Sequence, residues 1–274
     1  FYIIVITYFA AYTNYFTYPS SESYLYWLLL LFILPHFYLL FKKKSESNFM
    51  IFHNWLIPLS VIITLGTIAQ VNEELMFIAY SSFFAILYFI GNFDFFKLQK
   101  SKNNSYKILG SLGTIVLLLI LSFNWFWIDL KNESFQFNEV LLSPEFFTSA
   151  IISLFAAGLL YLQLKNKTLS QIKPIVLVFI LFIPTFLIGL ASEISVVFIN
   201  IFVLAIGIFT IRDGAKQDHL GVLNFGLLII TALVICRFFD ESITFVIRGI
   251  LFVTVGVGFF ATNYWILKKR KTNE

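Results

Sequence analysis

The sequence predicts an all-α integral membrane protein, and its composition, its apolar runs and the placement of its charges each point to this class. Apolar residues make up 59% of the 274 residues and charged residues 12%, which is too little polar surface to coat a soluble globule. The apolar runs approach the length of about 20 residues that a helix needs to cross a bilayer. Since backbone amides in lipid need internal partners and the runs lack strict alternation, we predict helices and not a barrel.

We predict about ten transmembrane helices, in the order in which the apolar runs occur. The predicted spans are 1–17, 24–41, 49–71, 75–96, 106–127, 146–164, 172–190, 194–211, 219–236 and 243–267. The first run begins at Phe1 without a methionine, so we expect an N-terminal part to be missing. That run lacks the basic start and the small-residue cleavage site of a signal peptide, and we interpret it as a helix.

Basic residues lie at alternate ends of these spans. Sixteen of the 19 lysines and arginines fall in the segments 42–48, 97–107, 165–173 and 212–219 and in the tail after Leu267. Lysine and arginine are retained on the cytoplasmic side of a membrane, so both termini are predicted to be cytoplasmic. The net charge of +4 therefore reflects topology, and we do not expect nucleic-acid binding. The three exceptions are Lys131, Arg237 and Arg248.

One long connection, 128–145, is predicted to be external and divides a single membrane domain into tentative halves, 1–127 and 146–271. Each half then contains five spans. Because five is odd, the halves would have opposite orientations, as in transporters built from inverted repeats. The halves share no convincing similarity residue by residue, so coincidence is the alternative.

The hairpin formed by the last two spans carries the first candidate site. Arg248 is expected to lie inside the tenth span, where an unpaired guanidinium is costly, so we expect a carboxylate beside it. Asp240 and Glu241 are the best placed carboxylates, and Glu193 is the next. Together with Arg237, these residues form either an external site for an anionic or zwitterionic solute or an ion-pair clamp that fixes the hairpin.

A second candidate site lies near the cytoplasmic ends of the second and third spans. His36 and His53 flank the short loop between these spans, and Asp94 is expected at a similar depth. Histidines beside a carboxylate can relay protons or hold a metal ion, and histidine at helix ends also serves simple interfacial packing. We predict a proton relay as the functional alternative to packing, with no metal and no cofactor.

The sequence gives little support for an enzyme. It contains no HExxH, no GxSxG and no phosphate-binding loop. Its single cysteine, Cys236, excludes a disulfide within the chain,. We therefore predict that the protein is not an enzyme.

The C-terminal residues resemble a known family. The run RDGAKQDHLGVLNFGLLIITALVICRFFD, followed by SITFVIRGILFVTVGVGFFATNYWILKKRK, covers about residues 212–271. It is similar to an uncharacterised family of bacterial, Bacteroidetes-like, multi-pass membrane proteins that is known only as a domain of unknown function. The resemblance implies a bacterial inner-membrane protein and an additional cytoplasmic segment before the first helices. It implies no catalytic or binding residues.

Two functional hypotheses follow from the sequence. The first is a permease for a small solute, with the external arginines receiving the solute and His36, His53 and Asp94 serving coupling or release. The second is a membrane scaffold or accessory subunit whose charged hairpin is structural. In both cases the lipid bilayer is the main partner, and the sequence decides neither a protein partner nor an oligomeric state.

Overall fold

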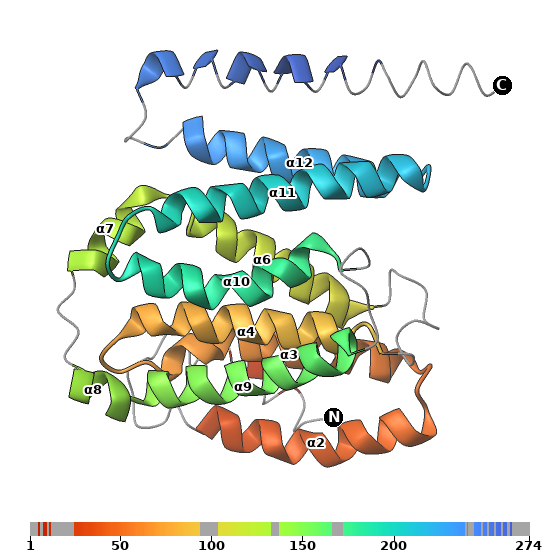
Figure 1. Ribbon diagram of the computed structural model, residues 1–274. Helices are drawn as coiled ribbons and strands as arrows, with labels where there is room; N and C mark the ends of the chain where they lie inside the picture. The colour runs from red at the N-terminus through yellow and green to blue at the C-terminus, as the bar shows by residue number, and fades with distance from the viewer. Residues whose placement is uncertain are drawn as a thin grey trace. The chain divides into compact units, whose positions relative to one another are not determined.

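The structure is a computed structural model of the chain, and the residues that it describes form helices and no strands (Figure 1). The described residues are 5, 8–9, 11, 25–93, 104–132, 137–165, 172–238, 240, 244–247, 249–250, 252–254, 256–258, 260–261 and 264. The predicted all-α class is therefore confirmed over this part of the chain.

Six helical stretches in the described part are long and apolar enough to cross a membrane. They are Leu25–Lys43, Asn48–Ile68, Glu73–Ile90, Pro144–Leu164, Ser195–Lys216 and Leu220–Phe238, and each overlaps one of the ten predicted spans. Helix α10 (Pro174–Gly189) is apolar but shorter. The predicted spans 1–17 and 243–267 lie largely outside the described residues, so the count of ten and the orientation stay predictions.

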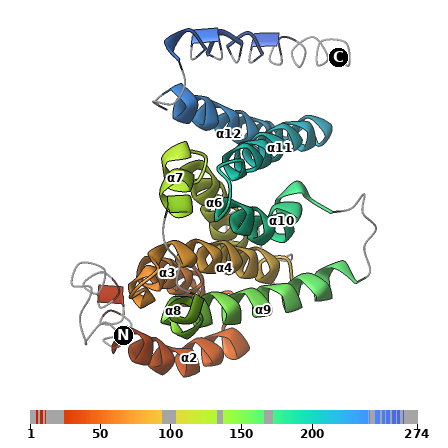
Figure 2. The same ribbon diagram turned by 60° about the vertical axis from the view of Figure 1, so that its left-hand side comes forward.

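Two compact units make up the chain. The first comprises residues 1–114 and 134–171. Its helices are α2 (Leu25–Lys43), α3 (Asn48–Leu65), α4 (Met76–Ile90), α8 (Phe137–Leu142), α9 (Pro144–Leu164) and the first part of α6 (Ser105–Ile120), with the short 3-10 helices η1 (Gly66–Ile68) and η2 (Glu73–Leu75). Helix α4 packs along α9, as Figures 1 and 2 both show.

Serine caps begin two helices of this unit. Ser47 precedes α3 and accepts a hydrogen bond from the Met50 amide at 3.2 Å. Ser143 precedes α9 and accepts one from the Phe146 amide at 3.2 Å, with Pro144 in the first turn. Both serines satisfy an amide that the helix itself leaves without a partner. The start of α9 is therefore fixed by local sequence, which matters for the position of Glu145.

The second unit comprises residues 115–133 and 172–274. It holds the end of α6, α7 (Asn124–Asn132), α10, α11 (Ser195–Lys216) and α12 (Leu220–Phe238). Helices α11 and α12 form an antiparallel hairpin and lie side by side (Figure 2). Glycine allows this approach: a Cβ on Gly226 would lie 2.7 Å from the Ile211 amide nitrogen. The division into halves 1–127 and 146–271 stays a prediction.

The fifth predicted span differs from the structure. The sequence predicts one helix over 106–127, whereas α6 ends at Ile120 and α7 begins at Asn124 after a bend of 74°. The predicted external loop 128–145 is also partly helical, because it contains the end of α7, the whole of α8 and the start of α9. The break between α6 and α7 is the feature around which the candidate site is built.

Candidate functional site

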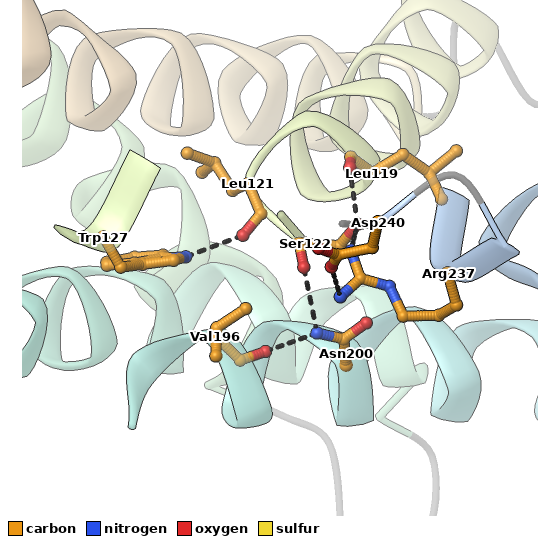
Figure 3. A network of polar contacts seen from close by, with 8 residues as sticks. All are labelled: Leu119, Leu121, Ser122, Trp127, Val196, Asn200, Arg237 and Asp240. Carbon is orange, nitrogen blue, oxygen red and sulfur yellow. Dashed lines mark hydrogen bonds and ion pairs between the residues drawn. The ribbon is translucent and has the colours of Figure 1, made fainter. Parts of the chain in front are cut away.

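The break at residues 121–123 leaves backbone carbonyls without partners in their own helix. A broken helix needs other groups to satisfy these carbonyls, particularly in a membrane. Trp127 and Asn200 supply them: the Trp127 indole N–H donates to Leu121 O at 2.7 Å, and the Asn200 amide donates to Ser122 O at 3.2 Å (Figure 3). Two side chains from different helices therefore stabilise the same break.

Trp127 is the apolar anchor of the break. Its side chain is fully buried, and its ring packs edge-on against Phe126 and Phe186, with centroids 5.2 and 6.2 Å away. A Cβ on Gly189 would collide with this ring. Trp127 thus fixes α7 against α10 and turns its indole N–H toward the break.

Arg237 and Asp240 form an ion pair at the end of α12. Arg237 Nη1 lies 2.5 Å from Asp240 Oδ2, and the two side chains are 16% and 8% exposed. Two opposite charges with so little exposed surface stabilise each other where either alone would be costly. The pairing of Arg237 with Asp240 is local, three residues apart along the chain.

The Arg237 guanidinium also reaches the break. Its Nη2 donates to Ser122 Oγ at 3.2 Å, and its Cζ lies 5.2 Å from the centroid of the Phe123 ring. Ser122 can accept this bond because its own hydroxyl donates to Leu119 O at 2.6 Å. Figure 3 shows Arg237 and Asp240 facing Ser122 across this contact. One arginine therefore joins the end of α12 to the broken helix.

Asn200, on α11, completes the network. Its amide nitrogen donates to Ser122 O at 3.2 Å and to Val196 O at 2.7 Å. Because two carbonyls can only accept, the nitrogen must face them, and this fixes the orientation of the amide. Its Oδ1 is then a buried acceptor without a hydrogen-bond partner, and Arg237 Nε is a buried donor in the same condition. The site holds one spare donor and one spare acceptor.

The other residues predicted for this site are placed differently. Glu193 pairs with Lys131, with Nζ and Oε1 3.1 Å apart and both side chains more than 40% exposed. An ion pair with this exposure contributes little to stability. Glu241 and Arg248 lie outside the described residues, so the expected carboxylate partner of Arg248 stays a prediction. Of the five predicted residues, the structure brings Arg237 and Asp240 together.

His36 and His53 lie close together, as expected from their place around one short loop. Their ring centroids are 5.4 Å apart. His53 is fully buried, and its Nδ1 lies 2.7 Å from Phe49 O. Since a carbonyl only accepts, Nδ1 carries the hydrogen, and Nε2 is left as an acceptor that has no partner,. Asp94 lies outside the described residues.

The tautomer of His53 is directly measurable, because the chain has three histidines. In protein labelled with 15N-histidine, we expect His53 to be neutral at pH 7 with its proton on Nδ1, because Phe49 O accepts there. His36 and His219 have no such contact and are expected to exchange between tautomers. The variants His36→Gln and His53→Gln assign the signals. A His53 signal with the proton on Nε2 would contradict the expected geometry.

Glu145 is a buried polar residue whose role the sequence analysis missed. It lies in the first turn of α9 and is fully buried. Its Oε1 accepts three consecutive backbone N–H groups, from Gln70 at 3.2 Å and from Val71 and Asn72 at 2.6 Å each. Converging amides of this kind hold an anion. Glu145 thereby attaches the connection between α3 and α4 to the start of α9.

Comparison with known proteins adds no assignment, because no family model, curated protein or solved structure matches this chain. Among the described residues there is also no cluster of three or more histidine, cysteine or acidic side chains that could hold a metal ion. The candidate site therefore rests on its own geometry.

Proposed function

We propose that this chain is a multi-pass permease of the bacterial inner membrane, with both termini in the cytoplasm, and that it carries a small anionic or zwitterionic solute. The solute site is the α6–α7 break with Arg237, Asp240, Ser122 and Asn200. The family resemblance of residues 212–271 agrees with this location but supplies no mechanism.

A single observation carries the proposal: a low-exposure ion pair contacts the break of an apolar helix. Arg237 donates to Ser122 within the break, while α6 and α7 meet at 74°. Transporters form solute sites at discontinuous membrane helices, where backbone groups are released from helical hydrogen bonds. Ionisable side chains inside a membrane protein also mark solute pathways more often than they mark simple packing.

A second function is favoured by a different observation. The carbonyls of Leu121 and Ser122 are each satisfied by a side chain, Trp127 and Asn200. A break that is satisfied in this way is also what a structural clamp requires. In this alternative the protein is a membrane scaffold or accessory subunit, and Arg237 only holds the end of α12 against α6.

Uptake by proteoliposomes distinguishes the two functions. We expect wild-type protein to accumulate a labelled solute from a panel of short carboxylates and amino acids. Replacing Arg237 with glutamine should reduce this uptake at least about tenfold, because one charge-assisted hydrogen bond corresponds to a factor of about 10 or more. The control is Asn224→Ala, at an exposed position of α12.

The scaffold alternative predicts a different pattern. Wild-type vesicles would then take up no member of the panel, and Arg237→Gln would lower only the thermal stability of the protein. The proposed proton relay through His36, His53 and Asp94 adds one expectation to the permease function. An imposed proton gradient should increase solute uptake by wild type, and His53→Gln should remove that increase.

A further inference from the structure

The charges and spare hydrogen-bonding groups of the site restrict the class of solute that it can hold. This restriction rests on the proposed function, since it concerns the same site. The relevant groups are Arg237, Asp240 and Asn200, which Figure 3 shows around Ser122.

The first restriction is the formal charge of the site. Arg237 is countered by Asp240, with Nη1 and Oδ2 2.5 Å apart. The neighbouring exposed pair, Lys131 with Glu193, is also neutral overall. A free anion placed beside Arg237 would meet the Asp240 carboxylate as well, and like charges in a site of low exposure repel each other strongly. A free cation would meet the same problem with the guanidinium. The solute that fits has no net charge.

The second restriction comes from the two atoms without partners. Arg237 Nε is a buried donor, and Asn200 Oδ1 is a buried acceptor. Asn200 cannot exchange its two amide atoms, because its nitrogen is held by Ser122 O and Val196 O. Leaving such groups without partners is costly. A ligand that satisfies both must accept one hydrogen bond and donate another.

We infer that the solute of this site is a zwitterion with a carboxylate and a primary or secondary ammonium group, that is, an amino acid with an uncharged side chain. Its carboxylate accepts from Arg237 Nε, and its ammonium donates to Asn200 Oδ1. Both hydrogen bonds are charge-assisted and therefore stronger than those of a neutral amide or alcohol. Because both protein atoms are buried, the solute enters only when the end of α12 separates from the break.

Thermal unfolding of the detergent-solubilised chain tests this class with matched probes. The probes are glycine, L-alanine, L-serine and L-leucine, then acetate, methylammonium and glycine betaine. Acetate and methylammonium each lack one charge, and glycine betaine is a zwitterion that has no N–H donor. We expect at least one amino acid to raise the unfolding midpoint in a concentration-dependent way, and the other three probes to have no effect at the same concentrations.

Two variants connect the effect to the named atoms. Arg237→Lys keeps a cation beside Asp240 but removes Nε, and Asn200→Ala removes the acceptor. Each should weaken the apparent affinity for the amino acid about ten- to a hundredfold, which corresponds to the loss of one charge-assisted hydrogen bond. Asn224→Ala is the control. The unfolding midpoint without ligand shows whether each variant is folded, and either folded variant suffices for the test.

The outcomes separate this inference from the proposed function. Stabilisation by acetate equal to that by amino acids, or by glycine betaine equal to that by glycine, overturns the assigned class while transport still stands. The absence of any effect of amino acids on wild type also overturns it. Amino acids that stabilise the wild type but are not taken up by proteoliposomes leave the assigned ligand class intact and overturn the permease function.

Discussion

Replacing Glu145 with alanine is expected to lower the free energy of unfolding by about 3 kcal/mol or more, because three buried backbone N–H groups lose their common acceptor and each such loss costs about 1–3 kcal/mol. The three donors are the amides of Gln70, Val71 and Asn72, at 2.6–3.2 Å from Oε1. Unfolding of the detergent-solubilised protein by heat or SDS, followed by tryptophan fluorescence, measures this loss.

Two further variants identify the cause. Glu145→Gln keeps an oxygen for the amides but loses the negative charge, so its effect should be about half that of the alanine variant, since charged hydrogen bonds are roughly twice as strong as neutral ones. Glu139→Ala removes a carboxylate from the exposed side of α8 and should change stability little. An alanine variant at position 145 that behaves like the one at position 139 would show that the contact is unimportant.

Gly214→Val is expected to destabilise the α11–α12 hairpin by about 3 kcal/mol, at the upper end of the usual cost of overpacking. A Cβ at this position would collide with the backbone nitrogen of Leu223 and would lie 2.7 Å from its Cα. A backbone cannot rotate away as a side chain can, so the two helices must separate. The gain in helix propensity on replacing glycine, at most about 1 kcal/mol, is too small to compensate.

Gly158 is the matched control, because it lies within α9 and a Cβ there would meet nothing within 4 Å. Gly158→Ala should therefore leave stability unchanged or raise it by up to about 1 kcal/mol, whereas Gly214→Ala should lower it. Thermal unfolding of the two alanine variants side by side is sufficient. Equal midpoints would mean that α11 and α12 are not in the close contact described.

The apolar helices could be predicted from the sequence, but the broken one could not. Six predicted spans overlap helices of membrane-spanning length and composition, because long apolar runs have few alternatives in lipid. The break after Ile120 occurs inside a run that stays apolar through Trp127, with only Ser122 and Asn124 to interrupt it. The contacts that favour a break there come from residues far along the chain, such as Asn200.

The candidate site was predicted only where charge made it visible. Arg237 and Asp240 attracted notice because arginine on the external side opposes the usual topology of basic residues. Asn200 is a single amide in an apolar run, and Glu145 follows a serine and a proline in an ordinary helix start. Their roles depend on contacts 73 to 78 residues away in sequence, and no local pattern reports such contacts.

The pairing of Arg237 with Asp240 also determines how the end of α12 responds to a membrane voltage. Moving one elementary charge through the membrane field changes the energy by about 2.3 kcal/mol for each 100 mV. A guanidinium that moves together with its carboxylate transfers no net charge, and a zwitterionic solute adds none. Opening of this end is therefore electrically silent, and any current that accompanies transport must be carried by a coupling ion at another position.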